Sequence, residues 1–246
     1  MLYDVWTVFW RDWIVLRHHL VKYILSRMVP PLLYLVAFGW GLGRSITVTD
    51  GSSYLDFLVP GILALNSMMI AFSSIITVHA ERVYHKSLDV YLSAPIHPSA
   101  FVLGKLLGAS FRSLLSSIII LVLAYISGAR LELTPLFLLV LLVNSMIFAA
   151  IGFYASMKID TYAEMGQVNT YILLPMSFLC GTFFSVATLP SAIRMLLELL
   201  PLTHTSQLLR TLAGGGDGSP TSYLILLLYA FISFLLAQKA FVDLKR

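Results

Sequence analysis

The chain has 246 residues, of which 59% are hydrophobic and only 11% are charged. Soluble globular domains carry roughly 25% charged residues, so this composition excludes that class and indicates an integral membrane protein. The net charge of +4 calls for no nucleic-acid partner, because the basic residues are spread along the flanks of apolar segments.

The first 22 residues predict an amphipathic helix that lies in the membrane interface. Trp6, Trp10 and Trp13 recur at three- and four-residue spacing on one side of it. Tryptophan prefers the headgroup level of a bilayer. The alternative is a helix packed on the protein's own cytoplasmic surface, and both placements are compatible. We expect no signal peptide here, because Asp4 and Asp12 interrupt the segment and no cleavage site follows an apolar core.

Six apolar segments are long enough to cross a bilayer, which requires about 20 residues in a helix. Their short connections leave no room for a separate soluble domain, so we expect one all-α membrane domain over residues 1–246. The predicted spans are 24–43, 55–78, 106–127, 134–157, 168–188 and 221–241.

Lysine and arginine are distributed unevenly between the two sides of these segments. With the N-terminus in the cytoplasm, eleven fall on the inner side and four on the outer side, as the positive-inside rule requires. Both termini are then cytoplasmic, in a plasma or inner membrane. The inner set is Arg11, Arg17, Lys22, Arg27, Arg82, Lys86, Lys105, Lys158, Lys239, Lys245 and Arg246; the outer set is Arg44, Arg130, Arg194 and Arg210.

The inner connection over residues 79–98 is unusually polar. Charged residues alternate there with apolar ones, which predicts one or two helical turns with an apolar and a charged side. A solvated loop is the alternative, but the regular placement of apolar residues favours docking onto another protein. The candidate contacts are Glu81, Arg82, Asp89, Tyr91, Leu92 and Pro95.

Arg112 is a charged residue inside the predicted third span, about 9 Å from its inner end at a rise of about 1.5 Å per residue. Its long side chain reaches the cytoplasmic interface by snorkelling or pairs with another group. The alternative is a role in transport, because an ionisable group at this depth is a functional candidate.

The segment 189–213 predicts short helices at the outer surface. Ser191–Leu200 has helical apolar spacing but is bracketed by Pro190 and Pro201, and ten residues are too few to span. We therefore expect this segment to be re-entrant or to lie in the membrane interface. The single cysteine, Cys180, precedes it and excludes an intrachain disulfide or a multi-cysteine metal site, so we expect a small buried side chain.

Catalytic motifs are absent from the sequence. It contains no His-Glu-x-x-His, no Gly-x-Ser-x-Gly and no phosphate-binding P-loop, so we expect no catalytic residue, metal or cofactor in this chain. All twelve acidic residues fall at span ends or in loops, whereas ion-driven carriers place such groups inside the bilayer. Energy for uphill transport would then come from another protein.

Two groups of motifs resemble one transporter family over essentially the whole chain. SLDVYLSAP at Ser87–Pro95 and LGK at Leu103–Lys105 resemble its cytoplasmic segment between spans two and three. CGTFFS at Cys180–Ser185, the following LP and PLTH, and Arg210 resemble its outer segment after span five. The chain thus resembles the transmembrane subunit of type-2 ABC exporters, a group that includes permeases for lipid-linked polysaccharides, nodulation factors and some antibiotics.

The resemblance implies an assembly of two copies of this chain with two ATP-binding subunits. ATP and magnesium would be held by the partner subunits, and this chain would bind no cofactor. The N-terminal helix would lie beside the motor subunit, and Glu81–Pro95 would form a coupling helix that docks onto it. Spans one and five would face each other at the dimer centre and line the route, and membrane lipid would be a further partner.

The route between these spans would carry an amphipathic, lipid-linked, glycan or drug-like substrate. Aromatic side chains of span five suit such cargo, although ordinary packing is the alternative for each one. The candidate path residues are Tyr171, Phe178, Phe183, Phe184 and Arg112. A secondary carrier or channel, an intramembrane enzyme and a membrane scaffold are the alternative functions.

Overall fold

A computed structural model describes residues 1–34, 36–37, 54–184, 186 and 189–245. These residues form helices and no strand, which confirms the all-α class. The helices are α1 (Leu2–His18), α2 (Leu20–Tyr34), α3 (Tyr54–Val83), α4 (Leu88–Ser93), α5 (Pro98–Ile126), α6 (Pro135–Lys158), α7 (Tyr162–Val168), the π-helix η2 (Asn169–Leu173), α8 (Leu174–Leu179), α9 (Ser191–Glu198), α10 (Pro201–Ala213) and α11 (Pro220–Lys245).

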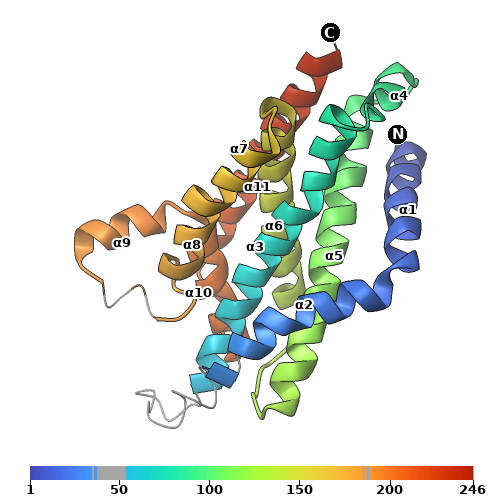
Figure 1. Cartoon of the computed structure of the whole chain (residues 1–246). Helices are drawn as coiled ribbons and strands as arrows, with labels where there is room; N and C mark the ends of the chain where they lie inside the picture. Colours follow the sequence, from blue (N-terminus) through green and yellow to red (C-terminus); the bar gives the residue numbers. More distant parts are fainter. Residues whose placement is uncertain (35, 38–53, 185, 187–188, 246) are drawn as a thin grey trace.

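Within the described part of the chain, four helices, α3, α5, α6 and α11, are long and apolar enough to cross a bilayer. The central helix α3 is buried along most of its length, whereas α11 is mostly exposed at the edge of the bundle (Figure 1). The two chain termini and α4 lie together at one end of the bundle. The exposed apolar faces of the outer helices fit contact with lipid, because apolar side chains are more favourably placed against hydrocarbon chains than against water.

The other two predicted spans differ in form. The described part of the first is α2, which contains Pro30 and Pro31 and ends at Tyr34; residues 38–43 lie outside the described chain. The fifth is helical from α7 through η2 to α8, with a π-turn in the middle, and turns away at Cys180; residues 185, 187 and 188 are not described. The count of six spans therefore remains a proposal.

Helix starts follow local chemistry. Proline occupies the first turn of α5, α6, α10 and α11, where its missing N–H costs no helical hydrogen bond. The Thr134 hydroxyl also accepts a bond from the Phe137 N–H at 3.2 Å and caps α6. Both signals act within the first helical turn, so they fix where these helices begin.

Short polar side chains join α3, α5, α6 and α10 inside the bundle. Buried polar groups need partners in an apolar interior, and here they satisfy one another between helices. The bonds are Asn66 Nδ2 to Ser116 Oγ (3.0 Å), Asn144 Nδ2 to Ser67 Oγ (2.7 Å), Ser113 Oγ with Ser145 Oγ (2.7 Å) and Thr205 Oγ1 to Asn144 Oδ1 (2.9 Å).

Helix α1 packs lengthwise on α5 rather than standing free. Phe9 and Trp13 each meet the Phe111 ring edge-on, at centroid distances of 5.8 and 5.2 Å. Trp6, which lies 5.6 Å from Phe9, and Trp10 are 56% and 45% exposed. The helix therefore packs on the protein's own surface and leaves these two tryptophans partly exposed.

Candidate functional site

Four charged side chains meet where α1, α3 and α5 come together. Lys105 is only 2% exposed, and its Nζ lies 3.2 Å from an Asp12 oxygen and 3.1 Å from a Glu81 oxygen. Arg11 lies 3.2 Å from the same Glu81 carboxylate. A buried ammonium is costly unless it is paired, and two carboxylates pair this one. We call Arg11, Asp12, Glu81 and Lys105 the charge cluster.

The charge cluster reaches helix α4 through an aromatic contact. The Arg11 guanidinium lies 5.2 Å from the centre of the Tyr91 ring, a cation–π distance. Tyr91 in turn packs on Phe101 of α5, with ring centres 5.0 Å apart. Burial raises the pKa of Tyr91, Arg11 acts against that rise, and the carboxylates of Glu81 and Asp12 add to it. Four helices, α1, α3, α4 and α5, are thus connected at one place.

Arg82 also contacts other residues of the same chain. Its guanidinium donates to the carbonyls of Met157 and Ile159, the latter at 2.5 Å, and contacts the Asp160 carboxylate at 2.5 Å. These carbonyls lie at the C-terminal end of α6, which has no further helical turn to satisfy them. The structure therefore places Arg82 as a connector between α3 and the end of α6.

The outward side of α4 is exposed and is available for contact with a partner. Asp89 and Pro95 are exposed, whereas Tyr91 and Leu92 are half-buried and pack inward. Val90 is 68% exposed and Tyr84 is 59% exposed, and neither was a candidate from the sequence. A helix of six residues is too short for periodicity to show which side faces out. We call Tyr84, Asp89, Val90, Ser93 and Pro95 the α4 surface.

Arg112 lies beside the interface helix. Its Nη2 donates to the Asp12 carbonyl at 3.4 Å, and the Tyr23 hydroxyl donates to the Arg112 carbonyl at 3.2 Å. The side chain of Arg112 thus contacts α1, and its backbone carbonyl contacts α2.

The aromatic candidates lie along one exposed side of the molecule. Tyr171 is 72% exposed on the π-helix, Phe178 is exposed on α8, and Phe184 is half-buried. The Phe183 ring lies 5.7 Å from Phe178 and 5.6 Å from Tyr34 at the end of α2. The structure therefore brings the described ends of the first and fifth predicted spans together.

A cavity of about 240 Å³ opens between α2, α3 and α8. Pro30, Pro31 and Phe178 form apolar walls, and Asn66 and Ser177 add polar atoms. The lining residues that the structure describes carry no charge. Such a surface suits apolar chains and neutral hydroxyl groups better than ions. Sequence reasoning found Phe178 but missed Asn66, which has no motif around it.

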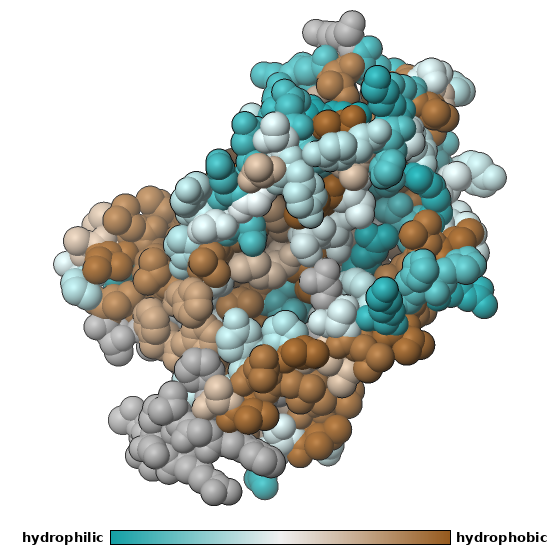
Figure 2. Space-filling model, in the orientation of Figure 1, coloured by the Kyte–Doolittle hydropathy of each residue, from teal (hydrophilic) through white to brown (hydrophobic). Residues whose placement is uncertain are grey.

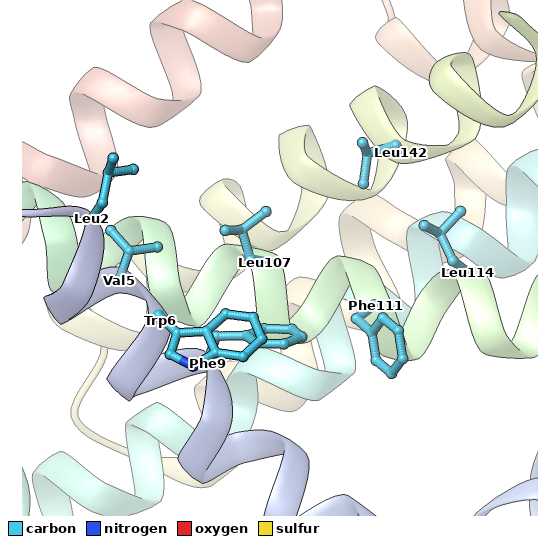
Figure 3. A pocket seen from close by; sticks show the side chains of 8 residues that line it. All are labelled: Leu2, Val5, Trp6, Phe9, Leu107, Phe111, Leu114 and Leu142. Atoms are coloured by element: carbon cyan, nitrogen blue, oxygen red, sulfur yellow. The ribbon is translucent and has the colours of Figure 1, made fainter. Parts of the chain in front are cut away.

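A second hollow, of about 380 Å³, separates part of α1 from α5 and α6. Figure 3 shows Trp6, Phe9 and Phe111 along it, with Leu142 of α6 on the far side. Its lining is wholly apolar. Next to this hollow α1 still packs on α5, because Val8 is only 4% exposed and lies against Gly104.

At the other end of the bundle, Arg210 fixes the turn that follows α8. It donates to the carbonyls of Phe57, Gly181 and Thr182, and its guanidinium lies 3.7 Å from the Phe57 ring centre. Gly181 has a φ of +79°, a conformation that glycine adopts without strain. Arg210 thus holds the CGTF turn against α3 and α10.

The junction of α9 and α10 is closed by three side chains. Thr203 donates to the Leu197 carbonyl at 2.6 Å, His204 Nε2 donates to the Glu198 carbonyl at 2.7 Å, and Tyr229 donates to the Leu199 carbonyl. A helix end in an apolar setting needs such donors. Figure 1 shows α9 projecting from the bundle, with Met195 70% exposed.

A model of the ABC-2 type transporter family matches residues 3–213. The chain is 26% identical to Nodulation protein J of Bradyrhizobium diazoefficiens, over 93% of this chain and 89% of that protein. It is 28% identical to Nodulation protein J of Rhizobium meliloti, over 85% and 81%. It is 22% identical to the inner membrane transport permease YadH of Escherichia coli K12, over 83% and 82%.

Proposed function

Because the chain belongs to the ABC-2 type transporter family, a family of membrane transport permeases, we propose that it is the membrane subunit of an ATP-driven exporter. Two copies would assemble with two ATP-binding subunits, and those subunits would hold ATP and magnesium. The protein would lie in the plasma or inner membrane with both termini in the cytoplasm, as its lysine and arginine distribution favours.

The α4 surface would dock onto the ATP-binding subunit. The observation that carries this proposal is the connection from α4 through Tyr91 and Arg11 into the charge cluster. A force on α4 would reach α1, α3 and α5 without an intervening loop. Asp89 and Val90 would make the docking contacts, whereas Glu81 and Arg82 would act inside the chain as connectors. Coupling requires contacts that differ between two motor states.

The cavity between α2, α3 and α8 would be the described part of the substrate path. Its uncharged lining supports an amphipathic, lipid-linked, glycan or drug-like cargo rather than an ion. Tyr171, Phe178, Phe183 and Phe184 would border the path, and a second copy would cover their exposed side. Residues 24–43 and 168–188 would complete six spans, and α9 and α10 would form the outer re-entrant pair.

Reconstitution with an ATP-binding subunit tests this function. The complex should accumulate a fluorescent lipid-linked glycan or an amphipathic dye in inverted vesicles only when ATP is supplied. A catalytically inactive ATP-binding subunit is the matched control. Uptake driven by a proton gradient without ATP, or failure of the two subunits to co-purify, would contradict the proposal.

A further inference from the structure

The bend between α1 and α2 gathers positive charge beside apolar side chains. A surface hollow of about 700 Å³ lies there, lined by Arg17, His18, His19, Val21, Lys22 and Leu25. In Figure 2 hydrophilic residues cover this bend, next to the hydrophobic band of α2. Cationic groups and an apolar wall therefore share one hollow.

The two strong cations of the hollow are not paired with acidic residues of the described chain. Arg17 and Lys22 are exposed, and neither enters an ion pair with the described residues. The nearest acid along the chain, Asp12, is engaged by Lys105 at 3.2 Å. By contrast, the basic residues in ion pairs are Arg11, Arg82, Lys105, Lys158 and Arg194. The bend is thus a site of uncompensated positive charge.

The bend is held in place against the bundle. The Tyr23 hydroxyl donates to the Arg112 carbonyl of α5 at 3.2 Å, and His18 Nδ1 donates to the Ile14 carbonyl at 2.8 Å. The first bond anchors α2 to α5 one residue after Lys22, and the second is a local bond in the last turn of α1, next to Arg17. A positioned pair of cations binds a doubly coordinated anion better than two independent surface charges do.

We propose that this bend binds the phosphate of an anionic phospholipid. Arg17 and Lys22 contact the headgroup phosphate, and Val21 and Leu25 contact the first methylenes of the acyl chains. Basic groups near a membrane surface favour anionic lipid by about fivefold each, so two positioned charges give a clear selectivity. The site is separate from the α4 surface and does not depend on the identity of the exported substrate.

A fluorophore at the bend provides the test. The single native cysteine, Cys180, is buried, so bimane on a Ser26→Cys variant reports from the hollow alone. The labelled full chain is reconstituted in phosphatidylcholine vesicles that contain either brominated phosphatidylglycerol or brominated phosphatidylcholine. We expect quenching at a lower mole fraction with the brominated phosphatidylglycerol.

The double variant Arg17→Gln/Lys22→Gln should lose up to roughly 25-fold in this selectivity, about fivefold for each charge removed. The matched control is Lys239→Gln/Lys245→Gln, which removes two exposed lysines from α11 that form no ion pair with described residues. Selectivity should survive in the control. An equal loss in both variants would show a general charge effect and overturn the site. Relief of quenching by inorganic phosphate alone would show a free-phosphate site and also overturn it.

Discussion

Arg11 of the first helix lies over the ring of Tyr91 in α4, 80 positions later in the chain, with 5.2 Å between the guanidinium carbon and the ring centre. The same guanidinium lies 3.2 Å from the Glu81 carboxylate. One side chain therefore joins α1 to α4 and to the C-terminal end of α3.

We expect Tyr91→Leu to impair coupling more than stability. Leucine keeps the apolar packing on Phe101 but removes the aromatic face under Arg11, a contact worth about 0.5–1 kcal/mol at a partly exposed site. ATP-driven transport by the reconstituted complex should fall, while co-purification of the ATP-binding subunit persists. Arg11→Gln should cause a similar loss, and the double variant should be no worse than the singles. If the losses of transport in the two single variants add up in the double variant, the two residues act independently and the predicted coupling is wrong.

Removing the Lys105 ammonium should destabilise the inner end of the bundle. In Lys105→Met the carboxylates of Glu81 and Asp12 lose their buried partner, and breaking such a pair costs about 3–5 kcal/mol. The detergent-solubilised protein should therefore unfold at a lower temperature. The exposed Lys86→Met serves as control and should leave the unfolding temperature unchanged. Partial recovery in Lys105→Met/Glu81→Gln would identify the unpaired charge as the cause.

Charge on the α4 surface should weaken docking. Val90→Glu places a carboxylate where an apolar side chain is 68% exposed, and Asp89→Lys reverses the adjacent charge. Each should reduce substrate-stimulated ATPase activity of the complex without affecting membrane insertion. Tyr125→Glu is the matched control, because it places a carboxylate at a position that is 82% exposed at the end of α5 remote from α4. If substrate stimulates the ATPase activity as strongly in both variants as in the unchanged protein, α4 is not part of the docking interface.

Arg210→Lys should loosen the outer turn after α8. A lysine ammonium lacks the planar fork with which Arg210 holds the carbonyls of Phe57, Gly181 and Thr182. We expect a loss of about 2 kcal/mol in the free energy of unfolding, since buried carbonyls are left without a donor. Amide hydrogen exchange in α8 should rise. The exposed Arg130→Lys, on the same predicted side, should change neither measurement.

Cysteine labelling tests the proposed orientation. Met195→Cys on α9 and Tyr84→Cys before α4 both place a thiol at a well-exposed position, while Cys180 stays buried. In intact cells a membrane-impermeant maleimide should modify the first and not the second. The opposite pattern would reverse the topology.

Local signals in the sequence account for the elements and their approximate order. The apolar segments and the prolines around Ser191–Leu200 predict helices that overlap α3, α5, α6, α9 and α11, because these signals act within a few residues. The family was also readable, since its motifs are contiguous. The cavity between α2, α3 and α8 was not readable, because Asn66 reaches it from α3 through packing with α2 and α8.

The sequence by itself determined an all-helical membrane protein of this transporter family, because composition, helix length and contiguous motifs are properties of neighbouring residues. Only the tertiary structure decided which charges face outward. It placed Glu81 and Arg82 in contacts inside the chain, turned Tyr91 toward Arg11, and left Asp89 and Val90 exposed. These outcomes depend on side chains that meet across 70 or more positions, as Arg11 and Glu81 do, and such meetings follow from packing rather than from local pattern.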